Sequence, residues 1–372
     1  MKIAILTVHR AFNMGALLQA WALKRVLEKM GHSVEMPELN TIGMVKRKVF
    51  SLRLYAGSIA RLALKLDANP LRASLGSSFD LWRHNRFIKK QLNSVPCSLE
   101  ELRRYDLIIV GSDQVWNQAI MKGDSSLFFG ETIPAGIPVI GYALSMGDEA
   151  SPATDYSRIA AAVRRFKAIT VRERFIQKTI EDMGFPSPKM VLDPTLLLTA
   201  EDYAEIEAPR LIEEPYLFVY NIGGGERIWT IADTVAKRIG VNRIAYSCGT
   251  LGWSPNLRQG HTWGDSPNRF LSYVRHAKAC LVSSFHGTAF SLIYDKPFVS
   301  VSYAARENLN NARQARLLEL VGQQSHLKHI SDSAEEIAEV ACSHISSANE
   351  SDLHTAAAQS RQILAQMIKG AQ

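Results

Sequence analysis

A short apolar run opens the chain, and an amphipathic segment and a second apolar run follow it. Residues 2–8 (KIAILTV) form a continuous apolar stretch, which is typical of a strand covered on both faces of a sheet. Residues 16–31 (ALLQAWALKRVLEKMG) have helical spacing and end at Gly31, and residues 32–36 (HSVEM) read as the next strand. This order of elements predicts a parallel sheet with a right-handed crossover.

The same alternation recurs and predicts two series of strands. The first series continues with apolar runs at 106–112, 138–144, 168–172 and 189–198. An acidic, proline-punctuated stretch at 200–214 interrupts it. The second series has runs at 216–222, 243–248, 279–284 and 297–303. We therefore expect an α/β fold with two Rossmann-like parallel-sheet domains in tandem and a ligand cleft between them.

The pattern also suggests limits for these domains. We predict an N-terminal domain, a C-terminal domain and a pair of terminal helices over 1–205, 206–335 and 336–372, respectively. A basic, helical insertion at about 42–95 interrupts the first domain. The length of 372 residues agrees with more than one hydrophobic core.

Positive charge is concentrated in one segment. The chain has a net charge of +7, and thirteen basic residues but four acidic ones lie between Lys46 and Arg104. Such an excess indicates either an anionic partner or a solvated helical face. Residues 49–66 carry apolar residues at near-helical spacing, so Arg53, Arg61 and Lys65 could face lipid head groups from an interfacial helix. We therefore predict peripheral contact with an anionic membrane as one reading, and packing on the first domain as the other.

Several classes of protein are disfavoured. The four cysteines are far apart, which argues against a disulfide framework and a cysteine zinc site. The first residues lack the pattern of a signal peptide, and no apolar run approaches the length of a membrane span. We expect a reduced, cytoplasmic protein without a metal ion, a resident cofactor or a nucleic-acid partner.

Polar residues follow four of the predicted strands. Ligands bind parallel sheets beyond the carboxyl ends of the strands, near helix amino termini. The groups at these positions are His9, Asn13 and Gly15; Gly111 to Asn117; Arg172 and Glu173; and His286 and Gly287. His286 is the strongest candidate, because a histidine between a buried strand and a helix amino terminus suits both an anion and a proton transfer.

Five blocks of the sequence, in the right order, resemble the polysaccharide pyruvyl transferase family. They are FNMGALLQAWAL (12–23), YDLIIVGSDQVWN (105–117), ITVRER (169–174), VLDPTLLL (191–198) and VSSFHGTAFSLIYDKPFV (282–299). One departure matters. Some members carry an arginine shortly before the signature histidine, whereas Ser283, Ser284 and Phe285 precede His286 here. The phosphate of a donor must then find its cation elsewhere.

The resemblance implies a fold similar to the two-domain glycosyltransferases of the B type. It also implies transfer of pyruvate from phosphoenolpyruvate onto a saccharide, including a lipid-linked one, as a ketal across two hydroxyls. His286 would then be the general acid and Asp113 the base for a sugar hydroxyl. The residues expected to bind the donor are Arg172, Ser284, Gly287, Arg306 and Arg313. Those expected to bind the acceptor are Asn13, Gly15, Gln114, Trp116 and Asn117.

Simpler roles remain open for several of these residues. Gly15 could allow tight helix packing, Arg172 and Glu173 could form a surface pair, and Trp116 could belong to the core. A nucleotide-sugar-dependent glycosyltransferase is the alternative function. It would need a carboxylate in the C-terminal domain to hold a ribose, for which Glu307 and Glu319 are the candidates. A non-catalytic carbohydrate-binding protein is a third reading.

Overall fold

The fold was analysed in a computed structural model of the chain. The structure describes residues 1–10, 12–39, 69–121, 125–147, 154–222, 225–248, 262, 265–311, 313–343 and 350–372. Side chains are described over the same ranges except at 69–79, 310–311 and 350. The predicted interfacial helix at 49–66, with Arg53, Arg61 and Lys65, lies outside the described residues.

The first domain is built on a seven-stranded parallel sheet with the order β3-β2-β1-β4-β5-β6-β7. The strands are β1 (Lys2–Leu6), β2 (Ser33–Leu39), β3 (Ser94–Cys97), β4 (Leu107–Val110), β5 (Val139–Leu144), β6 (Ala168–Val171) and β7 (Lys189–Met190). β4 and β5 are buried along their whole length, as continuous apolar runs require in a sheet covered on both faces. The strand order reverses between β1 and β4.

Helices cover both faces of this sheet. They are α1 (Met14–Lys29), α3 (Asn69–Gln91), α4 (Gln118–Met121), α5 (Tyr156–Arg165), α6 (Arg174–Asp182) and α7 (Ala200–Ala204). Short 3₁₀ turns are η1 (Glu100–Arg104), η2 (Ser125–Leu127) and η3 (Pro194–Leu197). The helix α1 is buried along most of its length and joins the main apolar cluster of the molecule.

The second domain has a five-stranded parallel sheet with the order β12-β11-β10-β8-β9. Its strands are β8 (Tyr216–Tyr220), β9 (Arg243–Ser247), β10 (Ala279–Val282), β11 (Phe298–Ser302) and β12 (Leu327–His329). Its helices are α8 (Arg227–Ile239), α9 (Pro267–His276), α10 (Phe285–Ile293), α11 (Arg313–Leu320) and α12 (Ala334–Ala341), with 3₁₀ turns η4 (Arg306–Asn311) and η5 (Gln324–His326). The order of this sheet reverses between β8 and β10.

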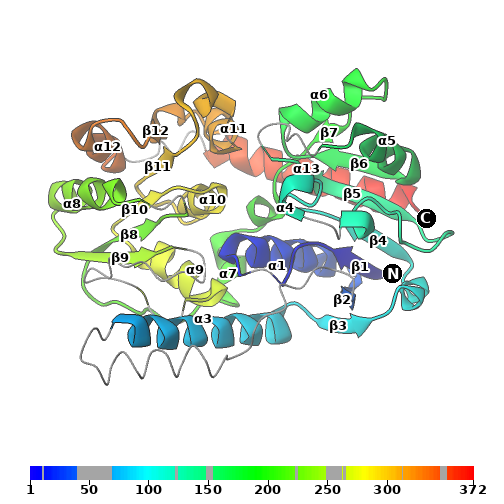
Figure 1. Cartoon of the computed structure of the whole chain (residues 1–372), viewed down its shortest axis with the longest axis horizontal. Coiled ribbons are helices and arrows are strands. Elements are labelled where there is room, and N and C mark those ends of the chain that lie inside the picture. The colour runs from blue at the N-terminus through cyan, green and yellow to red at the C-terminus, as the bar shows by residue number, and fades with distance from the viewer. Residues whose placement is uncertain are drawn as a thin grey trace.

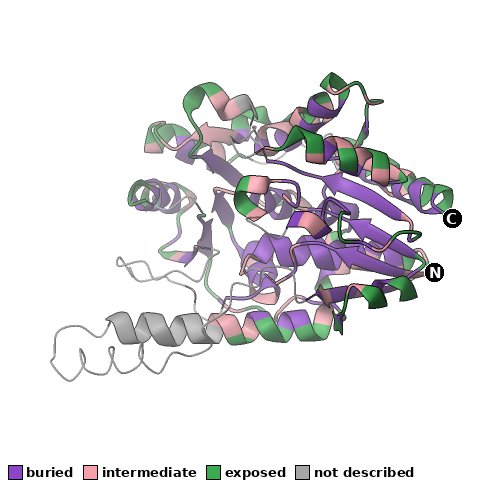
Figure 2. Cartoon of the chain, turned by 45° about the vertical axis from the view of Figure 1, so that its right-hand side comes forward, coloured by how far each residue is buried: buried purple, intermediate pink, exposed green. Residues whose placement is uncertain are grey.

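Two helices connect the domains. Figure 1 shows α3 below α9 of the second domain and α1 of the first, and the carboxylate of Asp80 on α3 accepts a hydrogen bond of 2.6 Å from the amide of Asp265 in the second domain. The last helix, α13 (Glu350–Gly370), returns to the first domain, where the hydroxyl oxygen of Ser360 accepts a hydrogen bond of 3.1 Å from the amide of Leu192. The strands form the buried interior and exposed residues lie on the outer helices (Figure 2).

Within the described parts of the chain, no helix is long and apolar enough to cross a membrane.

Candidate active site

The two topological switch points face each other across the domain junction. α1 begins shortly after β1, at the switch point of the first sheet, and α10 begins shortly after β10, at that of the second. In open parallel sheets, ligands bind at such points, beyond the carboxyl ends of the strands. Four strands of the first domain, β4 to β7, are followed by polar residues that meet near α10: Ser112, Ser145, Arg172 and Asp193.

His286 stands where α10 meets α1. It is a first-turn residue of α10 and is 9% exposed. Its ring packs so closely on Gly15 of α1 that a Cβ added there would lie 2.1 Å from Nδ1. Gly15 is therefore needed for more than backbone packing, because any larger residue would displace the imidazole. This contact brings together two residues that the sequence analysis had assigned to one site from different domains.

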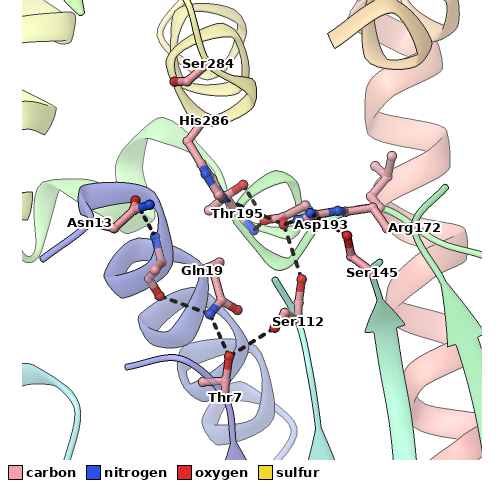
Figure 3. Close-up of polar contacts among 12 residues, drawn as sticks. Thr7, Asn13, Gln19, Ser112, Ser145, Arg172, Asp193, Thr195, Ser284 and His286 are labelled. Carbon is pink, nitrogen blue, oxygen red and sulfur yellow. Dashed lines mark hydrogen bonds and ion pairs between the residues drawn. The ribbon is translucent and has the colours of Figure 1, made fainter. Parts of the chain in front are cut away.

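Asp193 holds the other side of the imidazole. Its Oδ2 lies 3.8 Å from Nε2 of His286, and Arg172 Nη1 donates to the same oxygen. Ser112 also donates to Oδ2, at 3.2 Å, while the amide and hydroxyl of Thr195 donate to Oδ1. Figure 3 shows His286 and Arg172 reaching this carboxylate from opposite sides. Asp193 is the residue that joins the two halves of the site.

The charge of Asp193 is secured by its surroundings. Burial alone would raise the pKa of this carboxyl, but interaction with His286, the charge of Arg172 and the Thr195 amide outweigh burial and hold the pKa well below its usual range. The carboxylate is thus ionised beside His286, in a position to orient the ring. Sequence analysis quoted the LDPT block but gave Asp193 no role. The available signal was an aspartate just beyond a predicted strand, followed by a proline that starts a 3₁₀ turn.

Arg172, one of the residues expected to bind the donor, is buried among protein groups. It is 4% exposed, and its guanidinium donates to Glu173 (2.9 Å), Asp193 and Ser145 (3.1 Å). Burial acts to lower its pKa, yet the carboxylates around it raise the pKa above the usual value. Phe285 covers its face at 5.1 Å. The alternative reading of Arg172 and Glu173 as a surface pair is wrong, since both are buried.

Gly287 and Ser284 have a structural task in the described fold. The hydroxyl oxygen of Ser284 caps α10 by accepting a hydrogen bond of 3.0 Å from the amide of Gly287. That amide is therefore already bonded, contrary to the expectation that it would be offered to a phosphate. Gly287 is required because a Cβ there would lie 2.8 Å from the side chain of Val282. A donor anion would have to use the other first-turn amides of α10.

The loop after β4 contains both fully buried and half-buried residues. Trp116 is fully buried, donates its Nε1 hydrogen to Phe128 and stacks on Phe129, so it cannot present a face to a sugar. Gln114 and Asn117 are half-buried and in contact, and the direction of the Gln114 amide decides which neighbour its oxygen accepts from: Asn117 in one orientation, at 2.8 Å, and Arg313 in the other. When the Gln114 amide is turned so that its oxygen faces Arg313, that oxygen accepts from both terminal nitrogens, at 2.9 and 3.0 Å. This contact connects the β4 loop with α11 of the second domain.

The remaining predicted site residues are Asn13, Asp113 and Arg306. Asn13 caps α1 by accepting a hydrogen bond of 3.2 Å from the amide of Ala16. Asp113 is half-buried and has a φ of +67°, a left-handed conformation that aspartate tolerates better than most residues. Arg306 lies on η4, is largely exposed and pairs with Asp332 at 2.6 Å. None of the described contacts links Arg306 to His286.

Within the described residues, no group of three or more His, Cys, Asp or Glu side chains could hold a metal ion.

The fold belongs to the class of two-domain α/β folds with the glycosyltransferase-B arrangement. UDP-GlcNAc 2-epimerase from Methanocaldococcus jannaschii has a TM-score of 0.51 at 12% identity, covering 98% of this chain and 99% of that one. A putative UDP-N-acetylglucosamine 2-epimerase from Listeria monocytogenes also reaches 0.51, at 8% identity over 99% and 95% of the two chains. The glycosyltransferase SsfS6 from Streptomyces sp. SF2575 has a TM-score of 0.42 at 14% identity, covering 97% and 96%. At these identities the likeness concerns the fold alone.

The family follows from the sequence. The model of the polysaccharide pyruvyl transferase family matches residues 13–305, and the chain belongs to this family of transferases. No match is found among curated proteins.

Proposed function

We propose that this protein transfers pyruvate from phosphoenolpyruvate onto a saccharide as a ketal that bridges two hydroxyls. The observation that carries the proposal is the position of His286, held between Gly15 and Asp193 where the two switch points meet. Membership of the family supports the reaction class. The saccharide is part of a polysaccharide or of its lipid-linked precursor.

The reaction needs a proton donor beside an anionic substrate. The terminal enol carbon of phosphoenolpyruvate takes up a proton, which leaves a cation on the carbon that bears the phosphate. One sugar hydroxyl attacks that carbon and loses its proton. The carbon–oxygen bond to phosphate then breaks, and the second hydroxyl attacks and loses its proton in turn. The products are the ketal and inorganic phosphate, with no oxidation or reduction.

In this proposal His286 delivers the proton to the enol carbon, a role worth roughly 10²–10⁴-fold in rate. Asp193 orients the imidazole from the side of Nε2. The ion pair with Arg172 Nη1 holds Asp193 in place. Asp113 remains the proposed base for a sugar hydroxyl. Arg313 is the proposed replacement for the arginine missing before His286, because Gln114 directs its guanidinium across the domain junction.

The test is direct. The purified protein is incubated with phosphoenolpyruvate and a panel of aryl and lipid-linked glycosides, and phosphate release is followed. We expect release that depends on the acceptor, together with a saccharide product heavier by one pyruvate ketal. Release of a nucleoside diphosphate from a nucleotide sugar, without use of phosphoenolpyruvate, would instead establish the glycosyltransferase alternative.

We also propose peripheral contact with an anionic membrane through α3. Trp82 is 54% exposed there, and the guanidiniums of Arg83 and Arg86 lie 5.8 and 5.5 Å from its ring. Lys89 and Lys90 continue the exposed face. An exposed tryptophan beside several cations is the composition of an interfacial anchor.

A further inference from the structure

A cavity lies beside the candidate active site. It has a volume of about 760 Å³ and is enclosed by α6, α11 and α13. Arg172 and Asp193 line one side of it, and His286 is not among its lining residues. The buried Arg172–Asp193 pair therefore stands between this cavity and the imidazole.

Cations from both domains gather on its wall. Arg174 and Lys178 come from α6, and Arg313 and Arg316 from α11. Arg174 has only a long contact of 3.9 Å with Glu319, and both side chains are more than half exposed, so this pair is weak. One end of the cavity is thus positively charged.

Arg316 is the most informative of these cations. It is half-buried, and within the described residues it has no hydrogen-bond or ion-pair partner. Burial and then the like charge of Arg174 lower its pKa. Glu319 and Glu173 act on this guanidinium through their charges without a described bond to it, and a half-buried guanidinium gains from an anion bonded to it directly. An anion bound in the cavity would supply the missing partner.

Glu173 accepts hydrogen bonds from Arg172 and Ser145 with Oε1 and leaves its other carboxylate oxygen for a ligand. It lines the same cavity, is 7% exposed, and its Oε2 has no hydrogen-bond partner among the described residues. A ligand with a hydroxyl group could donate a hydrogen bond to this oxygen. A singly protonated phosphate has both a hydroxyl for Glu173 and acceptor oxygens for Arg316.

Most of the rest of the wall is apolar, apart from Glu319, Gln359 and Ser360. The apolar part is formed by side chains from four elements or their flanks: Phe175, Leu192, Leu196, Leu317, Leu320 and Ile363. A cavity of this volume is in the range of pockets that enclose drug-sized ligands, and a small anion alone would leave most of it unfilled. Its walls therefore suit a ligand that is charged at one end and apolar at the other.

We propose that this cavity binds an amphiphilic phosphate, with the phosphate between α6 and α11 and the hydrocarbon against α13. The site is built from groups that the proposed transfer step does not use, apart from Arg313 and the shared Arg172–Asp193 wall.

Decyl phosphate, kept below the concentration at which it forms micelles, is the probe, and calorimetry measures its binding to the full chain. We expect saturable binding at least about tenfold tighter than that of inorganic phosphate or of decanol. Arg316→Gln should weaken it at least about tenfold, the loss of one charge-assisted contact. Arg238→Gln is the matched control, since Arg238 is an exposed residue of α8 away from the cavity, and it should bind like the wild type.

Ala356→Phe provides an independent check, because Ala356 lines the cavity from α13 and a larger side chain would fill it without a change of charge. This variant should also lose decyl phosphate binding. Unchanged binding in both Arg316→Gln and Ala356→Phe would overturn the proposal, as would inorganic phosphate binding as tightly as decyl phosphate.

The measurement involves no turnover, so its outcome is separate from that of the pyruvyl-transfer proposal. Only one extension rests on the proposed function: a lipid-linked acceptor belongs to this chemical class, and the cavity would then hold its carrier phosphate.

Discussion

Gly15 allows the histidine of one domain to rest on the first helix of the other. Its backbone is helical, so alanine would favour the helix, but the new Cβ would meet His286 Nδ1 at 2.1 Å. We predict that Gly15→Ala folds normally and loses about ten- to a hundredfold in kcat/KM, because a displacement of about 1 Å can have this effect. Steady-state kinetics and circular dichroism measure the two properties.

Gly370→Ala is the control for this change. Gly370 is also helical, and a Cβ there would contact nothing within 4 Å. Its activity should equal that of the wild type. Full activity in Gly15→Ala would show that the close approach to His286 has no part in turnover.

Asp193 links stability to the geometry of His286. We predict that Asp193→Asn lowers the free energy of unfolding by about 3 kcal/mol, because it leaves Arg172 buried without its full partner. The pKa of Asp193 is depressed in the folded state, so its stabilising effect is complete above the ordinary aspartate value of about 3.9 and is lost as pH falls through the lower folded value.

Urea unfolding at several pH values tests this prediction. The difference between wild type and Asp193→Asn should be constant above about pH 5 and should shrink below about pH 4. A difference that stays the same down to pH 3 would contradict the assignment of a depressed pKa to this carboxyl.

The sequence predicted the residues at the strand ends but not how they pair. His286, Gly15 and Arg172 stand out because they follow apolar runs. Their contacts depend on how two domains close on each other, and a single sequence carries little information on that geometry. Trp116 shows the same limit, since nothing in its local pattern distinguishes a sugar platform from a core residue.

At the scale of elements, α10 depends on its first residues. Ser284 caps the helix, so Ser284→Ala should lower the free energy of unfolding by about 1 kcal/mol. Ser284→Asp keeps a capping oxygen and should restore the stability, but its negative charge should raise the KM for phosphoenolpyruvate. Thermal melts and kinetics separate the two effects. An unchanged KM in Ser284→Asp would place the donor's anions away from this helix.

Most apolar runs were read correctly as strands. β1 and β4 to β11 lie within predicted runs, including the edge strands β7 and β9. β3 and β12 were missed because they are edge strands of four and three residues without a long apolar run, and β3 contains Pro96, which a central strand position would not accept. The helical character of the basic insertion is seen in α3, within the described part of that segment.

At the scale of the whole molecule, α3 spans both domains and carries an exposed basic face. If this face meets the membrane, the protein should sediment with anionic liposomes, less so as salt increases. Replacing Arg86 and Lys89 by glutamate should abolish most of this binding. The same reversal at Lys237 and Arg238 of α8 changes the net charge equally and should have little effect. Equal loss in both double variants would show attraction by net charge alone and would reject a docking face on α3.

The central claim is that His286, at the domain junction, is the general acid of pyruvyl transfer from phosphoenolpyruvate. The measurement that tests it most directly is acceptor-dependent phosphate release from phosphoenolpyruvate, compared in wild type and His286→Ala under identical conditions. We predict release by the wild type with formation of a pyruvate ketal, and a rate at least about a hundredfold lower in a folded His286→Ala protein. Near-normal release by His286→Ala, or no use of phosphoenolpyruvate by the wild type with any acceptor, would contradict the account.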